Sequence, residues 1–325
     1  LKGRMFAWSA KQARSYSVAQ QRTFGPSLTK KLRHGLADAL VLKKIRSVLG
    51  PNLRYIVSGG APLATDLAQF YAGMGITLIQ GYGLSETTGP IAVQHLGANP
   101  IGTVGLPLPG NFIKIAKDGE ILVRGQAVMP GYYHLPEETQ AVMPDGRWFH
   151  TGDIGSISRN GQLSITGRKK ELIVTAGGKN VSPEILEDAL ATHPLIANVI
   201  VVGDQRPFIG ALITLDAEML PDWLRKHGLP RCSPAEAAQL SEVQASLERA
   251  IERANKAVSR AESIRKFRII DASFTVENGY VTPSMKLRRR KVIADYAHEI
   301  DELYGGPVEA TERPRRRFSF RRREH

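Results

Sequence analysis

The sequence predicts an α/β region followed by a smaller α+β domain, because the pattern of strand and helix signals changes twice along the chain. Residues 53–80 have the pattern of strand, loop, helix and strand, an order typical of a parallel sheet. Residues 101–166 are rich in glycine and proline between short strand patterns, which predicts a small antiparallel barrel or sheet. After Gly167, strands and longer helices alternate again, which indicates a separate α+β domain.

The first fifty residues are predicted to be helical. Leucines recur at helical spacing with lysines and arginines between them, and Gly50-Pro51 ends the pattern. The strand expected at 53–57 is apolar enough to be buried and ends in SGGAPL, and the strand at 77–80 ends in GYGLSETTG. Ligands of parallel sheets bind at the carboxyl ends of strands, so these two loops are candidates for a binding site.

The C-terminal domain has its own helix and strand signals. Ser182 and Pro183 are suited to the N-cap and the first turn of a helix. Two apolar strands, an amphipathic helix at 241–264 and the strand KFRII follow, and Thr282-Pro283 is expected to open a last helix with Lys286 in its first turn. We therefore expect domains at 1–167 and 168–306, and a basic tail without regular structure at 307–325.

Charge and composition exclude several classes of protein. The net charge is +13, but the first fifty residues contribute +10 and residues 307–325 contribute +4, so the body between them is close to neutral. A nucleic-acid binder would carry a basic face with interleaved aromatic residues on a known module, and none is visible. Cys232 is the only cysteine, which excludes an intrachain disulfide and multi-cysteine metal sites. No apolar run reaches the length of a membrane helix, so we expect a cytoplasmic protein, with peripheral contact at the inner membrane face as an alternative.

Three short strings contain side chains suited to a nucleotide. GYGLSETTG supplies an aromatic ring at Tyr82, hydroxyls, and the Glu86 carboxylate, a hard oxygen ligand for Mg²⁺. WFHTGD places Asp153 at a turn, where a carboxylate can accept both ribose hydroxyls. GRKKE is a cationic cluster at the boundary between the domains. Each has an ordinary alternative: a helix N-cap, a common turn and a solvated linker.

The order of six strings narrows these alternatives. SGGAPL, GYGLSETTG, GEILVRG with VMPGYY, WFHTGD, GRKKELIVTAGGKNVSPEILED and PSMKLRRR occur in this succession from about Leu28 to Tyr304. The succession resembles the adenylate-forming superfamily, and within it bacterial long-chain fatty-acyl-CoA ligases. The resemblance implies that residues 1–167 are part of the AMP-binding large domain, a parallel-sheet remnant with a small β-barrel, and that residues 168–306 are a mobile C-terminal domain.

The resemblance also implies roles for individual residues. The catalytic residues would be Lys286 for adenylate formation, Glu86 holding Mg²⁺, and Ser85 at the α-phosphate, where the family usually has threonine. Lys170 would be the hinge, within residues 168–170, about which the C-terminal domain turns. The residues that would contact adenine, ribose, phosphate or the pantetheine arm of coenzyme A are Gly60, Ala61, Pro62, Gly81, Tyr82, Gly83, Thr87, Asp153, Arg168, Gly177, Gly178 and Lys179.

The implied reaction is ATP-dependent ligation of a long-chain fatty acid to coenzyme A through an acyl-adenylate, with ATP, Mg²⁺ and coenzyme A required. The 325 residues do not contain the family's Gly-rich loop for the β- and γ-phosphates or the upstream half of the large domain. We therefore expect apolar surface to be left uncovered and the reaction to be incomplete in this chain, with a separate chain as one source of the missing half. A non-catalytic nucleotide-, coenzyme A- or partner-binding remnant and a fatty-acyl-AMP ligase remain alternatives.

Overall fold

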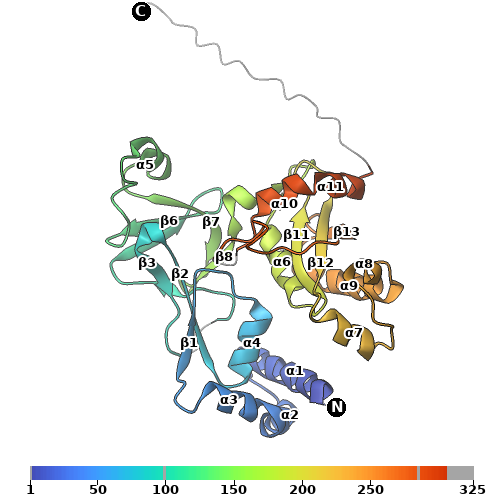
Figure 1. Cartoon of the computed structure of the whole chain (residues 1–325). Coiled ribbons are helices and arrows are strands. Elements are labelled where there is room, and N and C mark those ends of the chain that lie inside the picture. Colours follow the sequence, from blue (N-terminus) through green and yellow to red (C-terminus); the bar gives the residue numbers. More distant parts are fainter. Residues whose placement is uncertain (1, 98–99, 284–285, 306–325) are drawn as a thin grey trace, which may run out of the picture.

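The computed structural model describes residues 2–97, 100–283 and 286–305 (Figure 1). The tail predicted at 307–325 lies outside the described residues. Among the described helices, none is long and apolar enough to cross a membrane.

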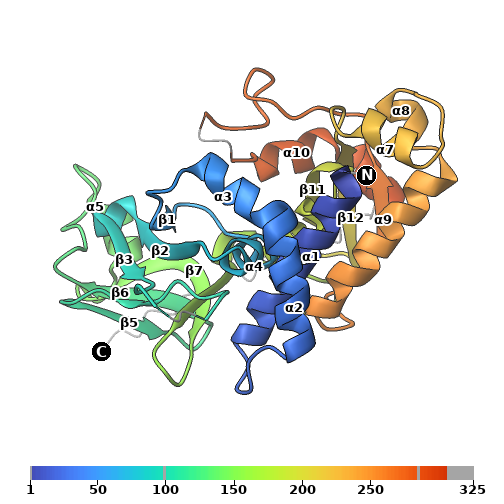
Figure 2. The same ribbon diagram turned by 90° about the horizontal axis from the view of Figure 1, so that it is seen from below.

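The N-terminal helices form a layer against the first sheet, as Figure 2 shows from below. Gly73 allows α1 and α4 to cross closely, because a Cβ atom there would lie 2.1 Å from the backbone oxygen of Ala13. A one-turn π-helix at Asp38–Leu42 joins α2 to α3, and the Arg46 guanidinium bonds Asp38 at 2.5 Å. The helices of this layer are α1 (Lys2–Gln20), α2 (Leu28–Ala37), α3 (Lys43–Leu49) and α4 (Thr65–Gly73). The helical prediction for the first fifty residues is confirmed.

The first sheet has the order β1-β2-β3-β4, and β1 and β2 are parallel as predicted. The expectation that the first strand is buried is wrong. β1 lies at the edge of the sheet, and the side chains of Tyr55 and Val57 are 46% and 64% exposed. The edge of β1 that faces away from β2 has no neighbouring strand among the described residues. The strands are β1 (Tyr55–Ser58), β2 (Thr77–Leu84), β3 (Gly89–Val93) and β4 (Leu106–Pro107).

The second sheet is antiparallel with the order β5-β6-β7-β8, one of the two forms that the sequence predicts for this region. A bridge between Gly105 and Leu163 links its last strand to the first sheet. The two sheets share a hydrophobic core in which Tyr82, Ile121 and Phe149 are buried. Its elements are β5 (Asn111–Ile115), β6 (Glu120–Gly125), α5 (Pro136–Val142), β7 (Phe149–Ile157) and β8 (Leu163–Arg168).

The C-terminal elements surround a third sheet with the order β11-β12-β13. β12 is buried along its whole length between the α6, α7 and α9 helices on one face and α10 and α11 on the other. Ser182 and Pro183 begin α6 as predicted, and Ser182 donates its hydroxyl to the backbone oxygen of Thr166. The elements are β9 (Ile173–Val174), β10 (Asn180–Val181), α6 (Pro183–Ala191), β11 (Ile196–Val202), β12 (Ile209–Leu215), α7 (Leu220–Lys226), α8 (Pro234–Ala237), α9 (Ser241–Ala254), β13 (Ile264–Ile269), α10 (Arg289–Asp295) and α11 (Ala297–Leu303).

Two helix predictions in this domain are corrected by the structure. The amphipathic helix ends at Ala254 rather than 264, because a 3₁₀ turn follows it and Asn255 bonds the backbone at Ile264. The last helix begins at Arg289, so Lys286 does not lie in its first turn. Instead, Val281 and Leu287 pair as an antiparallel bridge.

Candidate functional site

Three residues predicted to bind the nucleotide meet where β2, β7 and β8 come together. The Tyr82 hydroxyl donates to Asp153 Oδ2 at 2.6 Å, and Arg168 Nε lies 3.1 Å from Asp153 Oδ1. The antiparallel register of β7 and β8 places Asp153 directly opposite Arg168. Burial and the neighbouring Asp153 carboxylate raise the pKa of the Tyr82 hydroxyl well above its usual range, so the hydroxyl remains a donor.

The turn after β2 contains the predicted Mg²⁺ ligand. Glu86 lies in a 3₁₀ turn, Ser85–Thr87, and its carboxylate accepts the Tyr132 hydroxyl at 2.9 Å. The Glu86 backbone oxygen accepts the amide of Met129 at 2.8 Å, which ties this turn to the loop after β6. Burial and the Glu86 carboxylate raise the pKa of Tyr132, which keeps its proton on the oxygen. Ser85 is exposed.

Thr87 has a structural role in the same turn. Its side chain is fully buried, and its hydroxyl contacts the Leu84 amide at 2.9 Å and the Gly89 carbonyl at 2.8 Å. Thr88 then adopts the left-handed conformation with φ 55°. The Thr87 hydroxyl is thus engaged inside the turn, and a contact between Thr87 and a nucleotide stays a prediction.

Glycines bring the two strand-end loops close together. A Cβ atom on Gly59 would lie 3.2 Å from the backbone oxygen of Gly81, and one on Gly83 would lie 1.9 Å from the backbone oxygen of Gly89. Gly60 has φ +78°, which favours glycine. Gly60, Ala61 and Pro62 are exposed, so their backbone is accessible beside β2. This arrangement leaves space for a flat ring to approach the backbone, which is the role predicted for the loop.

Glu120 is a buried carboxylate at the amino end of β6, beside Gly152 and Asp153. The prediction that Asp153 stands at a turn is wrong, because Asp153 lies within β7 at a bulge in its pairing with β6. Its oxygens accept the Gly152 amide at 3.0 Å, His150 Nδ1 at 3.1 Å and Lys169 Nζ at 2.8 Å. Lys169 also reaches Asp118 at 2.6 Å. Although burial raises the pKa of Glu120, these three hydrogen bonds outweigh it and hold the pKa below its usual value.

The predicted hinge and coenzyme A loop follow directly after β8. Lys170 is exposed in the 3₁₀ turn Lys169–Glu171 between β8 and β9. Gly177, Gly178 and Lys179 form the tight turn of the β9–β10 hairpin, where Gly178 has φ +76°. The string LIVTAGG contains the two-residue strand β9 followed by this turn. The Lys179 ammonium lies 3.4 Å from Glu262.

Lys286 is not brought to the cluster around Asp153 in this structure. It is exposed, and its backbone amide and carbonyl bond Thr282 at 3.0 Å and 2.8 Å. Within the described part of the chain, its ammonium has no hydrogen bond or ion pair. The structure therefore assembles Tyr82, Asp153 and Arg168, and leaves the predicted catalytic lysine apart from them.

The side chains around Glu86 show how the predicted Mg²⁺ could be held. Over residues 2–97, 100–283 and 286–305, no group of three or more His, Cys, Asp or Glu side chains lies together to hold a metal ion. Mg²⁺ is often held by one or two carboxylates together with substrate phosphate oxygens and water. A half-buried carboxylate at Glu86 fits that mode, and Tyr132 orients it.

Two residues of this region were given no role by the sequence analysis. Tyr132 and Glu120 both stand in strings quoted only for their resemblance, VMPGYY and GEILVRG. A tyrosine and a glutamate in short strand-and-turn strings have no distinctive spacing, so only their positions relative to Glu86 and Gly152 reveal what they contact. An open pocket of about 590 Å³ beside α9 and β13 is lined by residues of the C-terminal domain, away from these two residues.

Comparison with known proteins identifies the family of the chain. The AMP-binding enzyme family matches residues 10–133, and the C-terminal domain of AMP-binding enzymes matches residues 170–307. The long-chain-fatty-acid–CoA ligase FadD15 of Mycobacterium tuberculosis is 48% identical over 304 residues, which cover 93% of this chain and 50% of that protein. The chain thus spans about half the length of the curated relatives it matches.

Solved structures agree in fold. The adenylation domain of a carboxylate reductase from Mycobacterium chelonae has a TM-score of 0.66 at 21% identity, covering 91% of this chain and 45% of that one. O-succinylbenzoate coenzyme A synthetase (MenE) from Bacillus subtilis, in complex with ATP and a magnesium ion, has a TM-score of 0.55 at 25% identity, covering 77% of this chain and 49% of that one. The chain belongs to the AMP-binding enzyme family.

Proposed function

We propose that this chain carries the adenine-nucleotide site and the C-terminal domain of an enzyme that ligates a long-chain fatty acid to coenzyme A at the expense of ATP. The observation that carries the proposal is the Tyr82–Asp153–Arg168 cluster. Its carboxylate is 3% exposed yet has a cation at one oxygen and a neutral donor at the other. A carboxylate held in this way can accept the two hydroxyls of a ribose.

The first half-reaction brings two anions together. A fatty-acid carboxylate would attack the α-phosphate of ATP, so the barrier depends mainly on positioning and on neutralising negative charge. Ser85 is exposed beside Glu86 and would donate its hydroxyl to the α-phosphate. The Lys286 ammonium would stabilise the charge that develops as pyrophosphate leaves. A magnesium ion held at Glu86 would supply further neutralisation of the phosphate oxygens.

The second half-reaction would use another face of the C-terminal domain. Attack of the coenzyme A thiol on the acyl carbonyl needs no cation at the phosphate, so Lys286 would have to withdraw. We propose that residues 168–306 turn about Lys170, which is exposed between two short elements, and bring the Gly177–Gly178 turn to the nucleotide. A domain boundary at 167–168 is part of this proposal.

Two other functions would use the same cluster. A fatty-acyl-AMP ligase would carry out only the first step, and a remnant without turnover would bind nucleotide or coenzyme A alone. The string GGKNVSPEILED, which supplies part of the turn after β9, the strand β10 and most of α6, favours the coenzyme A ligase. The identity to FadD15 supports the same substrate class.

Binding of AMP to the 325-residue chain tests the nucleotide site, measured by isothermal titration calorimetry. Asp153→Asn should weaken binding at least about tenfold, because each ribose hydroxyl loses a charged acceptor. Asp271→Asn is the matched control, since Asp271 is exposed in the C-terminal domain. Equal affinities for the wild type and Asp153→Asn would refute the proposed site.

ATP–pyrophosphate exchange with palmitate tests turnover. We expect no exchange by the chain alone, because its sequence has no Gly-rich loop for the β- and γ-phosphates. Lys286→Ala sets the background, and Lys256→Ala, a second exposed lysine of the C-terminal domain, controls for the loss of charge. Exchange above the Lys286→Ala background would overturn this expectation and show that the chain forms the adenylate alone.

A further inference from the structure

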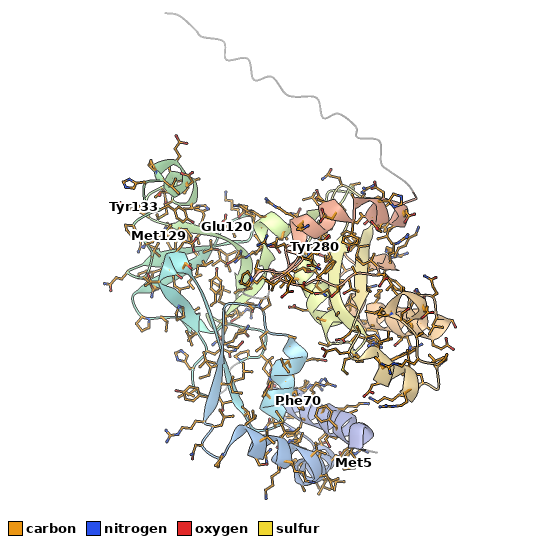
Figure 3. All side chains as sticks on the ribbon, viewed as in Figure 1. Met5, Phe70, Glu120, Met129, Tyr133 and Tyr280 are labelled. Carbon is orange, nitrogen blue, oxygen red and sulfur yellow. The ribbon has the colours of Figure 1, made fainter. Side chains whose placement is uncertain are left out.

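Glu120 is the carboxylate of the nucleotide region that the proposed reaction does not use. Figure 3 labels it between the β5–β8 sheet and the C-terminal elements. Its side chain is only 5% exposed, and its partners come from β7 and from the turn after β8. Burying a charged carboxylate costs free energy unless hydrogen bonds and opposite charges compensate it. The contacts of Glu120 therefore indicate a specific role for this residue.

We propose that Glu120 is a positioning residue that holds the β7 bulge at Gly152–Asp153 in its nucleotide-binding shape and, through Lys169, ties that bulge to the proposed hinge at Lys170. The inference rests on the proposed function for its nucleotide, but the two contacts it invokes are observed directly in the fold. One oxygen, Oε1, accepts the Gly152 amide, and the other, Oε2, accepts the Lys169 ammonium.

The contact with Gly152 acts on Asp153 through the backbone. Gly152 has φ +72°, a conformation that favours glycine, and it lies where the register of β6 and β7 shifts at a bulge inside β7. The Glu120 oxygen fixes the amide of that residue, and Thr151 fixes the next amide, that of Asp153, at 3.1 Å. The direction of the Asp153 side chain toward Tyr82 and Arg168 therefore depends on a carboxylate from a different strand.

The contact with the hinge acts through Lys169. Its ammonium bridges Glu120 at 2.8 Å and Asp118 at 2.6 Å, and it immediately precedes the predicted hinge residue, Lys170. Of the two acceptors, Asp118 is 51% exposed and is screened by water, whereas Glu120 is buried. The tether therefore depends mainly on Glu120. Rotation of the C-terminal domain about Lys170 would pull directly on this pair.

Hydrogen exchange of the nucleotide-free full chain tests both contacts. Glu120→Gln keeps the shape but removes the charge, and it should speed exchange about tenfold or more at Gly152–Asp153 and at Lys169–Glu171. Lys169→Met should speed exchange only at Lys169–Glu171, and Asp118→Asn should leave both segments within about twofold of wild type. A residue that only stabilised the fold would lower the melting temperature without this site-specific pattern.

The same variants are then titrated with AMP. Glu120→Gln should raise the Kd about tenfold, while Asp118→Asn should leave it within about twofold. Unchanged hydrogen exchange at Lys169–Glu171 in Lys169→Met would refute the tether. Unchanged hydrogen exchange at Gly152–Asp153 in Glu120→Gln would refute the positioning role. If Glu120→Gln does not fold, Glu120→Asp, which keeps the charge but draws it back, must give the same two-site pattern. If the wild type itself binds no AMP, the proposed function fails, and the exchange data still decide the inference.

Discussion

The N-terminal helices and the C-terminal sheet of this chain differ in how far their apolar side chains are exposed to solvent. On α2, Leu28, Leu32 and Leu36 are 74%, 68% and 54% exposed, although they recur at helical spacing. On β12, Leu212 and Ile213 are at most 1% exposed, with helices covering both faces of the sheet. A periodic apolar stripe thus marks a surface that can be buried, whereas tertiary neighbours determine whether it is.

This difference shows where the chain is structurally complete in itself. The C-terminal domain buries its own apolar residues, while the α2, α3 and β1 region leaves large side chains such as Val48, 86% exposed, in solvent. The sequence analysis expected uncovered apolar surface, and these exposures confirm it. Contiguous surfaces of this kind mark interaction sites or aggregation liabilities. That a separate chain covers this one remains a prediction.

The largest expected effect is in the C-terminal core. Leu212→Ala should lower the free energy of unfolding by about 2–5 kcal/mol, because it leaves a cavity in a fully buried strand. Leu32→Ala is the matched change on the exposed stripe, and it should stay within about 0.5 kcal/mol of wild type. Urea unfolding monitored by circular dichroism measures both. Equal losses for the two variants would mean that the stripe is covered in solution.

The N-terminal layer is nevertheless expected to have one closely packed point. Gly73→Ala should destabilise the chain by about 1–3 kcal/mol, since the new methyl group would meet the Ala13 backbone at 2.1 Å. Gly35→Ala is the control, because a methyl group there meets nothing within 4 Å. The same unfolding measurement applies. A neutral Gly73→Ala would indicate that α1 and α4 do not cross as observed.

A third prediction concerns the pH dependence of the C-terminal domain. Burial, followed by Glu171, Asp188 and Glu187, raises the pKa of Glu184 to about 7. A raised carboxyl pKa means that the folded chain binds more protons between about pH 4.5 and 7, so its stability falls as pH rises through that window. Glu184→Gln should therefore stabilise the chain by about 1–2 kcal/mol at pH 8, a figure discounted for the partial exposure of the group, and by almost nothing at pH 4.5.

Thermal unfolding at a series of pH values measures this effect. Glu218→Gln is a suitable control, because Glu218 is exposed in the same domain. A stabilisation that is equal at pH 4.5 and pH 8 would show that titration of Glu184 is not its cause.

The smallest expected effect on stability is that of charging the exposed stripe. Replacing Leu28, Leu32 and Leu36 by lysine should change the free energy of unfolding by less than about 0.5 kcal/mol per site. The same change should reduce self-association, because it removes the apolar patch. Light scattering coupled to size-exclusion chromatography compares the two proteins. An unchanged association state would show that this stripe does not mediate contacts between copies.

Much of the architecture could be predicted from local sequence signals. The helical start, the parallel pair β1–β2, the antiparallel sheet and the order of the C-terminal strands follow from periodicity and from glycine and proline positions. The failures occurred where a local signal competed with tertiary pairing. Thr282-Pro283 has the chemistry of a helix start, yet Val281 and Leu287 pair as an antiparallel bridge and the next helix begins at Arg289. The prediction that β1 is buried failed because the apolar pattern of a strand does not show whether another strand or a helix covers it.

The sequence by itself determined the family and the candidate residues, because six strings in one order specify the backbone positions at which those residues stand. Only the tertiary structure decided which of them meet. Asp153 pairs with Arg168 through strand register and with Tyr82 across 71 residues of chain. Glu120, which no spacing distinguishes, proves to be the buried charge that contacts Gly152 and Lys169. Contacts between distant segments depend on packing of the whole chain, and local sequence patterns do not predict them.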